Sequence, residues 1–129
     1  MALDPVVKEL AQGKNFAALT VHLPSGDAAT HVMWIDADDD HLVFNTEVGR
    51  AKFRAIEADP RVTIAVWDAD NPYHYAEVRG RVVATDDGPA AREHIDALAK
   101  KYMGLDDYPN PIATRRVIVK VRPDRQRSQ

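Results

Sequence analysis

The sequence predicts a mainly β protein in which six antiparallel strands form a closed barrel and two or three helices are accessory. Three observations predict this class. Apolar and polar residues alternate with a period of two in several short runs, turns rich in proline, glycine and aspartate separate these runs, and few stretches show helical apolar spacing. With 129 residues the chain has the size of one domain. We therefore expect a single barrel domain over residues 1–129.

The first half of the chain opens with a short helix and continues into a three-stranded meander. Asp4 is a capping residue, Pro5 suits a first helical turn, and Gly13 is placed to end the helix. Alternating apolar residues then predict three strands joined by polar turns, at residues 17–23, 29–36 and 41–45. A second helix is expected at about residues 49–58, and Pro60 ends it.

The second half is predicted to contain three more strands and one longer helix. Alternation indicates the strands at residues 62–67, 75–85 and 117–121. Gly88 and Pro89 open the helix and Gly104 closes it. Its apolar residues recur at i, i+4, i+7 and i+11 and form one buried stripe of Ala91, Ile95, Leu98 and Tyr102. The polar tail at residues 123–129 is expected to fray.

The composition excludes several classes of function. The formal net charge of -3 argues against general nucleic-acid binding, which needs a basic surface. The chain contains no cysteine, so disulfides, thiol nucleophiles and thiolate metal sites are excluded. The N-terminus lacks the basic start and apolar run of a secretory signal, and no apolar run approaches the ~20 residues of a membrane span. We therefore expect a cytoplasmic protein.

The most informative local feature is the segment that joins the third strand to the second helix. It carries a hydroxyl at Thr46, a glycine at Gly49, and two cations, Arg50 and Lys52. Unpaired backbone N–H groups and the helix dipole favour phosphate at such a helix start. Arg50 can add a two-pronged contact and Lys52 a point charge. The alternative is an ordinary capped helix with a solvated basic face, in which Thr46 or Glu47 is the cap.

Apolar residues also occupy the second face of the predicted sheet, where a small barrel with one solvated wall does not need them. These positions are Met33, Ile35, Val43 and Ile118. Burial of this face against a second copy of the chain is the most economical explanation, so we expect a homodimer.

Five histidines and an acidic turn raise the question of a metal site. No two histidines have a spacing suited to shared coordination, and no cysteine can complete a zinc site. The acidic run at residues 38–40 resembles half a calcium loop but lacks its downstream glycine and glutamate. We expect no metal site, and we interpret His22, His41 and His94 as surface residues.

Four blocks of sequence, in order and at matching spacing, resemble a known family. The blocks are HVMWID at 31–36, NTEVGRAK at 45–52, DPRV at 59–62, and DNPY at 70–73 followed by EVRGRV at 77–82. They resemble the split β-barrel flavin and deazaflavin proteins related to pyridoxamine-phosphate oxidase. Within that family, the chain is most similar to the small single-domain reductases that use the deazaflavin coenzyme F420. The resemblance covers about residues 16–125.

The resemblance implies a cofactor site shared between two subunits. Arg50 and Lys52 would grip the cofactor phosphate with help from Thr46, and the strand at 31–35 would offer backbone groups to the tricyclic ring. Trp67 and the loop at 71–73 would close the pocket, from the partner subunit. The full set implied is His31, Val32, Met33, Trp34, Asn45, Thr46, Arg50, Lys52, Trp67, Asn71, Pro72 and Tyr73.

Two further positions bear on this resemblance. His74, like His31, would lie near the ring pocket. The family often carries an asparagine three residues after the lysine, where this chain has Ala55.

The function that the resemblance implies is hydride transfer from reduced F420 to an electron-poor small molecule. The cofactor would carry the chemistry, which explains why the sequence shows no obvious acid–base pair. The proton that completes the reduction has several possible sources: water, Tyr73, His74 or an arginine-held substrate group. Two alternatives remain open, an FMN-dependent oxidase or reductase on the same fold, and a non-catalytic protein that binds a cofactor or a tetrapyrrole.

Overall fold

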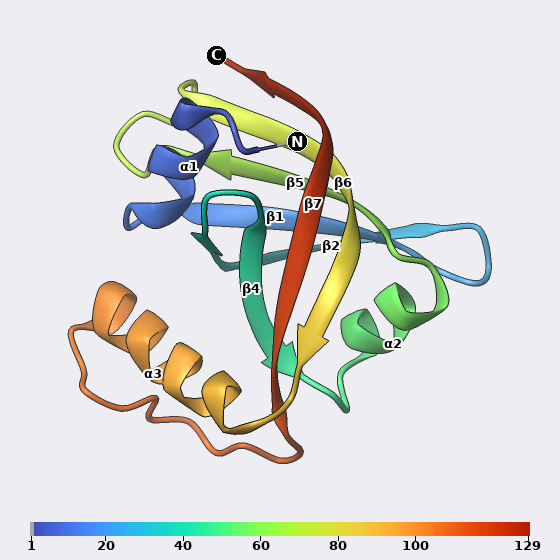
Figure 1. The fold of residues 1–129 in the computed structure, drawn as a ribbon, viewed down its shortest axis with the longest axis vertical. Coiled ribbons are helices and arrows are strands. Elements are labelled where there is room, and N and C mark those ends of the chain that lie inside the picture. The colour runs from blue at the N-terminus through green and yellow to red at the C-terminus, as the bar shows by residue number, and fades with distance from the viewer. Residues whose placement is uncertain (1) are drawn as a thin grey trace.

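The computed structural model describes residues 2–129 as one strongly curled antiparallel sheet with three helices packed around it (Figure 1). The elements run α1 (Pro5–Gln12), β1 (Phe16–His22), β2 (Ala28–Trp34), β3 (Asp36–Ala37), β4 (Leu42–Glu47), α2 (Ala51–Ala58), β5 (Arg61–Trp67), β6 (Tyr75–Asp86), α3 (Pro89–Met103) and β7 (Arg116–Ser128). The order in the sheet is β2-β1-β5-β6-β7-β4-β3. The predicted class, mainly β with accessory helices in a split barrel, is confirmed.

The sheet has one strand more than the six expected, because the second strand breaks at Ile35. The backbone N–H of Ile35 donates to the Tyr102 hydroxyl at 3.0 Å, and its carbonyl accepts from Lys101 Nζ at 2.6 Å. Side chains of α3 thus take the hydrogen bonds that a neighbouring strand would otherwise make. The two residues after this break form the separate strand β3, which pairs with β4.

The three helices begin and end close to the expected positions. Pro5 occupies the first turn of α1, and α3 ends at Gly104, whose φ of 71° lies in the left-handed region that favours glycine. The helix α2 starts at Ala51, two residues later than expected, and no side chain caps it. No helix within residues 2–129 is both long and apolar enough to cross a membrane.

Alternation along the strands fills the barrel interior. The largest fully buried side chains come from several strands and from α1, and include Leu19, Phe44, Ile64, Val78 and Val119. α1 packs against β3, β5, β6 and β7 and closes one end of the barrel, whereas α2 packs against β1. Each burial of a side chain of this size contributes about 1.5–3 kcal/mol, so the interior is the principal source of stability.

The prediction of a frayed tail is wrong, because β7 continues to Ser128. Its last residues pair with the start of β6, with Arg79 opposite Arg125 and Ala76 opposite Ser128. The tail side chains are mostly exposed, yet the long β6 supplies backbone partners for the whole segment, and these do not depend on side-chain polarity. A Cβ on Gly80 would lie 2.2 Å from the Arg122 carbonyl oxygen, so glycine is needed where the two strands approach closely.

The four apolar positions that suggested an exposed second face are covered within one chain. Met33, Ile35 and Val43 are buried, and Ile118 is half-buried. Met33 and Ile35 pack in the main barrel core, and α3 packs against β4 and β7, the strands that carry Val43 and Ile118 (Figure 1). The exposure that suggested a homodimer is therefore not present.

Candidate functional site

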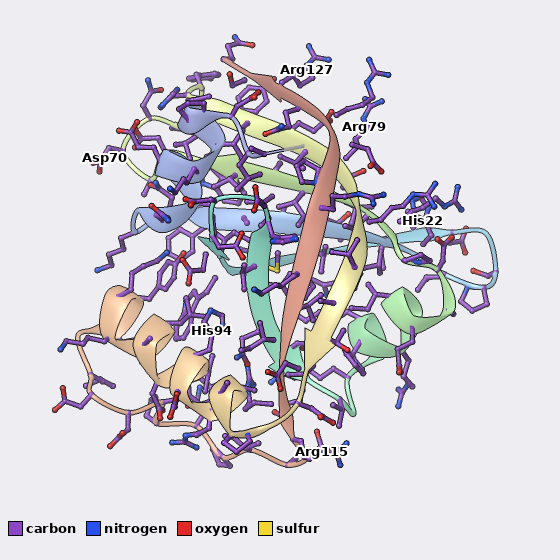
Figure 2. All side chains as sticks on the ribbon, in the orientation of Figure 1. His22, Asp70, Arg79, His94, Arg115 and Arg127 are labelled. Atoms are coloured by element: carbon purple, nitrogen blue, oxygen red, sulfur yellow. The ribbon has the colours of Figure 1, made fainter. Side chains whose placement is uncertain are left out.

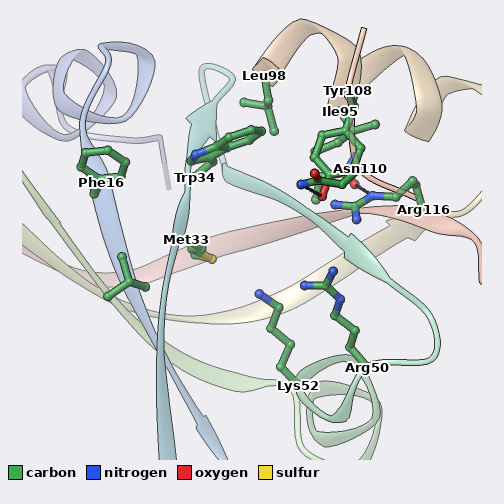
Figure 3. Close-up of a pocket in the computed structure, with 12 residues that line it drawn as sticks. Phe16, Met33, Trp34, Arg50, Lys52, Ile95, Leu98, Tyr108, Asn110 and Arg116 are labelled. Carbon is green, nitrogen blue, oxygen red and sulfur yellow. Dashed lines mark hydrogen bonds between the residues drawn. The ribbon is translucent and has the colours of Figure 1, made fainter. Parts of the chain in front are cut away.

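The main cavity lies between β2, the start of α2, α3 and the start of β7 (Figure 3). Its volume is about 270 Å³. The lining residues are Phe16, Val32, Met33, Trp34, Asn45, Arg50, Lys52, Ile95, Leu98, Tyr108, Asn110 and Arg116. A second depression of about 360 Å³ shares Val32, Arg50 and Lys52 with it and adds His31 and Ala51. Together they form a groove within the size range of small-molecule sites.

One end of the groove is an aromatic and aliphatic wall. The Trp34 ring stacks on Tyr102 with centroids 5.0 Å apart and planes 3° apart, and Tyr108 meets Trp34 edge-on at 6.1 Å. Ile95 and Leu98 complete the wall from α3. Burial raises the pKa of Tyr102 to about 12, so its hydroxyl stays protonated and donates to the Asn15 carbonyl. The wall is therefore rigid and apolar, which suits a flat ring.

The other end is cationic, as the sequence predicts. Arg50 and Lys52 extend from the start of α2 into the cavity (Figure 3). Burial, followed by repulsion from Arg50 and Arg116, lowers the pKa of Lys52 to about 8. An anion bound beside this lysine would stabilise its charged form, which burial and the two arginines disfavour.

Glu47 does not cap α2. Its Oε1 accepts from the Thr114 N–H at 2.8 Å and the Thr114 hydroxyl at 3.1 Å, while Oε2 accepts from Arg50 Nη2 at 3.3 Å. The hydrogen bond from the Thr114 backbone is the main reason that the pKa of Glu47 is lowered, so the carboxylate is ionised. The alternative of an ordinary capped helix is therefore not what the structure shows, because the helix start has no side-chain cap.

Arg116 is a pocket residue that sequence reasoning missed. It is the first residue of β7, its side chain is 6% exposed, and its Nε donates to Asn45 Oδ1 at 2.7 Å. Its guanidinium lies over the Tyr108 ring at 5.2 Å. The only signal in the sequence is a cation just before the apolar alternation of the last strand, which equally suits a solvated strand end. Phe16, Ile95, Leu98, Tyr108 and Asn110 were also missed as lining residues.

Asn45 and His94 join the pocket to α3. Asn45 Nδ2 donates to the Ala91 carbonyl at 3.0 Å and lies 3.1 Å from His94 Nδ1, and His94 Nε2 lies 3.2 Å from Asp36 Oδ2. The interpretation of His94 as a surface residue is wrong, since its side chain is 13% exposed and faces the sheet (Figure 2). Helical spacing places position 94 next to the buried stripe, where it meets polar partners on β3 and β4.

The structure brings together seven of the twelve residues that the resemblance implied. Those seven line the two depressions: His31, Val32, Met33, Trp34, Asn45, Arg50 and Lys52. Thr46 lies on the other face of β4, buried, with no hydrogen-bond partner for its hydroxyl. Trp67 ends β5 opposite Phe16 and Tyr75, outside the cavity of its own chain.

The loop at 71–73 also lies outside the cavity of its own chain, and the Tyr73 side chain is 81% exposed. His74 Nδ1 contacts the carbonyl of Gln129 at 2.7 Å instead of the groove. Ala55 packs in the core, so an asparagine at this position would face the interior of this chain.

The β2 strand lies at the edge of the sheet and borders the groove. It pairs with β1 on one side, which leaves the backbone groups of its other edge available. Val32, at the middle of this segment, is 70% exposed. A planar ligand with carbonyl and N–H groups along its rim fits such an edge. The groove thus combines an anion-binding end, an apolar wall and a free strand edge.

This fold and groove define a class, the split β-barrels of the flavin and deazaflavin oxidoreductase type. The chain belongs to the pyridoxamine 5'-phosphate oxidase family, whose family model it matches over residues 3–129. The family resemblance read from the sequence is thereby confirmed.

Solved structures agree with this assignment. An F420 reductase is 31% identical, with a TM-score of 0.84, over 98% of this chain and 100% of that chain. A conserved hypothetical protein from Mycobacterium tuberculosis has 18% identity and a TM-score of 0.75, over 98% and 84% of the two chains. General Stress Protein 26 from Bacillus anthracis has 18% identity and a TM-score of 0.70, over 95% and 90%. The last two show the fold alone, and no curated protein matches the chain.

No group of three or more potential metal-ligating side chains occurs among residues 2–129. The residues of the groove are instead cationic, amide and aromatic. This donor set suits an organic ligand with an oxyanion and a ring.

Proposed function

We propose that this protein is an F420-dependent reductase that transfers a hydride from the reduced deazaflavin to an electron-poor small molecule. The observation that carries the proposal is one groove with a cationic end, an apolar aromatic wall and a free strand edge. It occurs in a chain that is 31% identical, over 98% of its length, to an F420 reductase. The reduced cofactor supplies the hydride, while the protein binds, orients and shields the reactants.

The residues of the groove have distinct roles in this proposal. Arg50 and Lys52 hold the cofactor phosphate next to the uncapped start of α2, where free N–H groups and the helix dipole assist. The free edge of β2 hydrogen-bonds the rim of the ring. The wall of Trp34, Ile95 and Leu98 excludes water from one side of the groove.

We further propose that a second copy of the chain completes the groove. The cavity of one chain is open and small for a tricyclic ring with a phosphate, and both Val32 on β2 and Tyr73 in the loop at 71–73 are largely exposed. An exposed apolar strand edge beside a binding groove is a common site of association. Sedimentation velocity at micromolar concentration should show a dimer, and a species that stays monomeric would remove this part of the proposal.

The second candidate is an FMN-dependent oxidase or reductase, and the match to the pyridoxamine 5'-phosphate oxidase family favours it. The two cofactors share a flat ring and a phosphate, so the groove described above accepts either. They differ in the polyanionic tail of F420, and the test must compare them directly.

The two tryptophans allow that test to be site-specific. Within one chain, Trp34 lines the groove and Trp67 does not, so a Trp67→Phe variant leaves Trp34 as the reporter of the groove. Titration with F420 should quench its fluorescence at lower concentration than titration with FMN. The Trp34→Phe variant is the matched control, in which quenching by direct contact should largely disappear.

Turnover completes the test. Reduced F420 should be oxidised in the presence of a quinone such as menadione and the wild-type protein, as followed by the return of F420 absorbance. Tight FMN binding without measurable F420 binding would support the second candidate, an FMN-dependent oxidase or reductase. Tight F420 binding without turnover of any acceptor favours the non-catalytic alternative.

A further inference from the structure

Arg116 stands out because it is buried, charged and incompletely hydrogen-bonded. Its side chain is 6% exposed and its Nη1 atom is buried without a hydrogen-bond partner. Within residues 2–129, Thr46 Oγ1 is the other such atom, and it faces the barrel interior. Leaving a buried charged donor unsatisfied is costly. Such a group at the wall of a cavity indicates a ligand atom that satisfies it.

The protein holds this guanidinium in place through other atoms. Asn45 accepts from Nε, and the Asn45 amide is itself fixed by the Ala91 carbonyl of α3. The Tyr108 ring lies under the guanidinium at 5.2 Å. Both contacts leave Nη1 free, so Arg116 is oriented before any ligand arrives.

Glu47 does not satisfy Arg116. Its Oε2 lies 3.3 Å from Arg50 Nη2 but 3.7 Å from Arg116 Nη1, which is too long for a hydrogen bond. Because both distances end on one oxygen, the two arginine nitrogens lie no more than about 7 Å apart. Two arginines this close together can each donate to a different oxygen of one phosphate in the groove.

The local charge also favours an anion. Arg50 and Arg116 share a single carboxylate, Glu47, and the lowered pKa of the nearby Lys52 arises in part from repulsion by both arginines. The three cations enter the same cavity from two separate elements, α2 and β7 (Figure 3). A ligand with about two negative charges balances this cluster.

We propose that Arg116 is the third cation of the phosphate subsite and binds the cofactor phosphate through its guanidinium, together with Arg50 and Lys52. This inference rests on the proposed function, because it assigns a role within the same groove. It goes beyond that function by adding a ligand-binding residue from the last strand, 64 positions after Lys52 in the sequence.

The test compares ligands that differ only in the phosphate. Binding of FMN and of riboflavin is measured by fluorescence for the wild type, Arg116→Gln and Arg116→Lys, and the same is done for F420 and its chromophore without phosphate and tail. Arg115→Gln is the matched control, because Arg115 is 67% exposed, pairs with Asp87 and does not line the groove. Circular dichroism and thermal melting check that each variant folds.

The preference for the phosphorylated ligand should fall about ten- to a hundredfold in Arg116→Gln, because one charge-assisted hydrogen bond is lost. Affinity for the ligand without phosphate should change less than about threefold. Lysine is shorter and lacks Nη1, so Arg116→Lys should also lose part of the preference. Arg115→Gln should match the wild type.

Two results would overturn the inference. The first is an unchanged preference in Arg116→Gln, or in Arg116→Lys if the glutamine variant does not fold. The second is an equal loss of affinity for the ligands with and without phosphate. That result would mean that Arg116 contacts the ring or supports the fold instead.

If the wild type binds no ring ligand, the proposed function fails but the role of Arg116 is still tested. Inorganic phosphate should then raise the melting temperature of the wild type and of Arg115→Gln, as any ligand of the folded state does. A rise of the same size in the Arg116 variants would overturn the inference independently of the cofactor.

Discussion

Two arginine-rich regions of this protein show opposite electrostatic arrangements. The first is the anion cluster of the groove, formed by Arg50, Lys52 and Arg116 around Glu47. The second, which we call the arginine ribbon, lies where β6 pairs with the end of β7 and carries Arg79, Arg81, Arg122, Arg125 and Arg127. Figure 2 shows Arg79 and Arg127 at one end of the molecule and Arg115, near the start of β7, at the other.

The ribbon has more arginines, but they are solvated and several are paired. Arg79 contacts Glu77 at 3.2 Å, and Asp124 lies 3.6 Å from Arg81 and 3.5 Å from Arg122. These arginine side chains are about half exposed, and exposed pairs of this kind contribute at most about 1 kcal/mol. In the anion cluster Arg116 is buried and Lys52 is half-buried, whereas Arg50 is as exposed as the ribbon arginines. The two regions therefore differ in the burial of Arg116 and Lys52 and in the number of cations per carboxylate, not in the number of arginines.

The largest expected effect follows from the anion cluster. Lys52→Ala and Arg50→Ala should each weaken binding of the phosphorylated cofactor about ten- to a hundredfold, because each removes a charge-assisted hydrogen bond. Fluorescence titration measures this effect, with Arg122→Ala in the ribbon as the matched control. Affinities that stay at the wild-type level would mean that the segment at 46–52 is an ordinary helix start that does not bind the cofactor phosphate.

Removing a carboxylate should cost more stability in the anion cluster than in the arginine ribbon. Glu47→Gln should lower the free energy of unfolding at pH 7 by about 1.5–3 kcal/mol, because a buried carboxylate with hydrogen bonds from Thr114 and Arg50 is lost. Asp124→Asn in the ribbon is the control and should cost less than about 1 kcal/mol. Urea unfolding of both variants provides the comparison.

The stability difference between the wild type and Glu47→Gln should depend on pH. The pKa of Glu47 is lowered in the folded protein, so its contribution is fully present above the ordinary glutamate value of about 4.5 and is lost as the pH falls through the folded pKa. The difference between the wild type and Glu47→Gln should therefore narrow below about pH 4.5. A difference that stays constant down to pH 3 would contradict an ionised, hydrogen-bonded Glu47.

Local signals in the sequence are sufficient to predict most of the fold. Pro5 at the start of α1, Gly104 after α3 and the period-two alternation of the strands each depend on near neighbours in the chain, and the structure follows them. The errors arise where distant segments decide the outcome. The end of β7 is ordered by its pairing with β6, and Met33 and Ile35 are buried in the core that distant strands form.

The candidate site also has a part that local sequence predicts and a part that depends on distant segments. Arg50 and Lys52 could be predicted because a strand, a glycine and a helix start are contiguous in the sequence. Arg116 and Tyr108 could not, since their role depends on how α3 and the following loop return the chain to β4. A lone cation before an apolar strand has no local property that separates a buried ligand donor from a solvated strand end.

The third prediction uses the titration of Lys52. Its pKa of about 8 means that it loses its proton as the pH rises through the range 7 to 9. Affinity for the phosphorylated cofactor should fall over this range, by up to about tenfold per pH unit once Lys52 is neutral, since one proton is linked to binding. In Lys52→Gln this fall should be absent, and the same fall in that variant would assign the titration to another group.

The smallest expected effect concerns the arginine ribbon. Arg79 and Arg81 of the ribbon are exposed cations of the kind that a polyanionic tail of F420 would contact, and a half-exposed arginine adds little to binding in water. Arg81→Ala should weaken F420 binding less than about threefold at low salt and leave FMN binding unchanged. At 0.5 M salt the effect should vanish, because exposed charges are screened over less than about 8 Å above physiological ionic strength. The loss in Lys52→Ala should persist under the same conditions, since its charge is partly buried. A tenfold, salt-resistant loss of F420 binding in Arg81→Ala would instead make the ribbon a second binding site, and pairing and exposure would no longer separate the two regions.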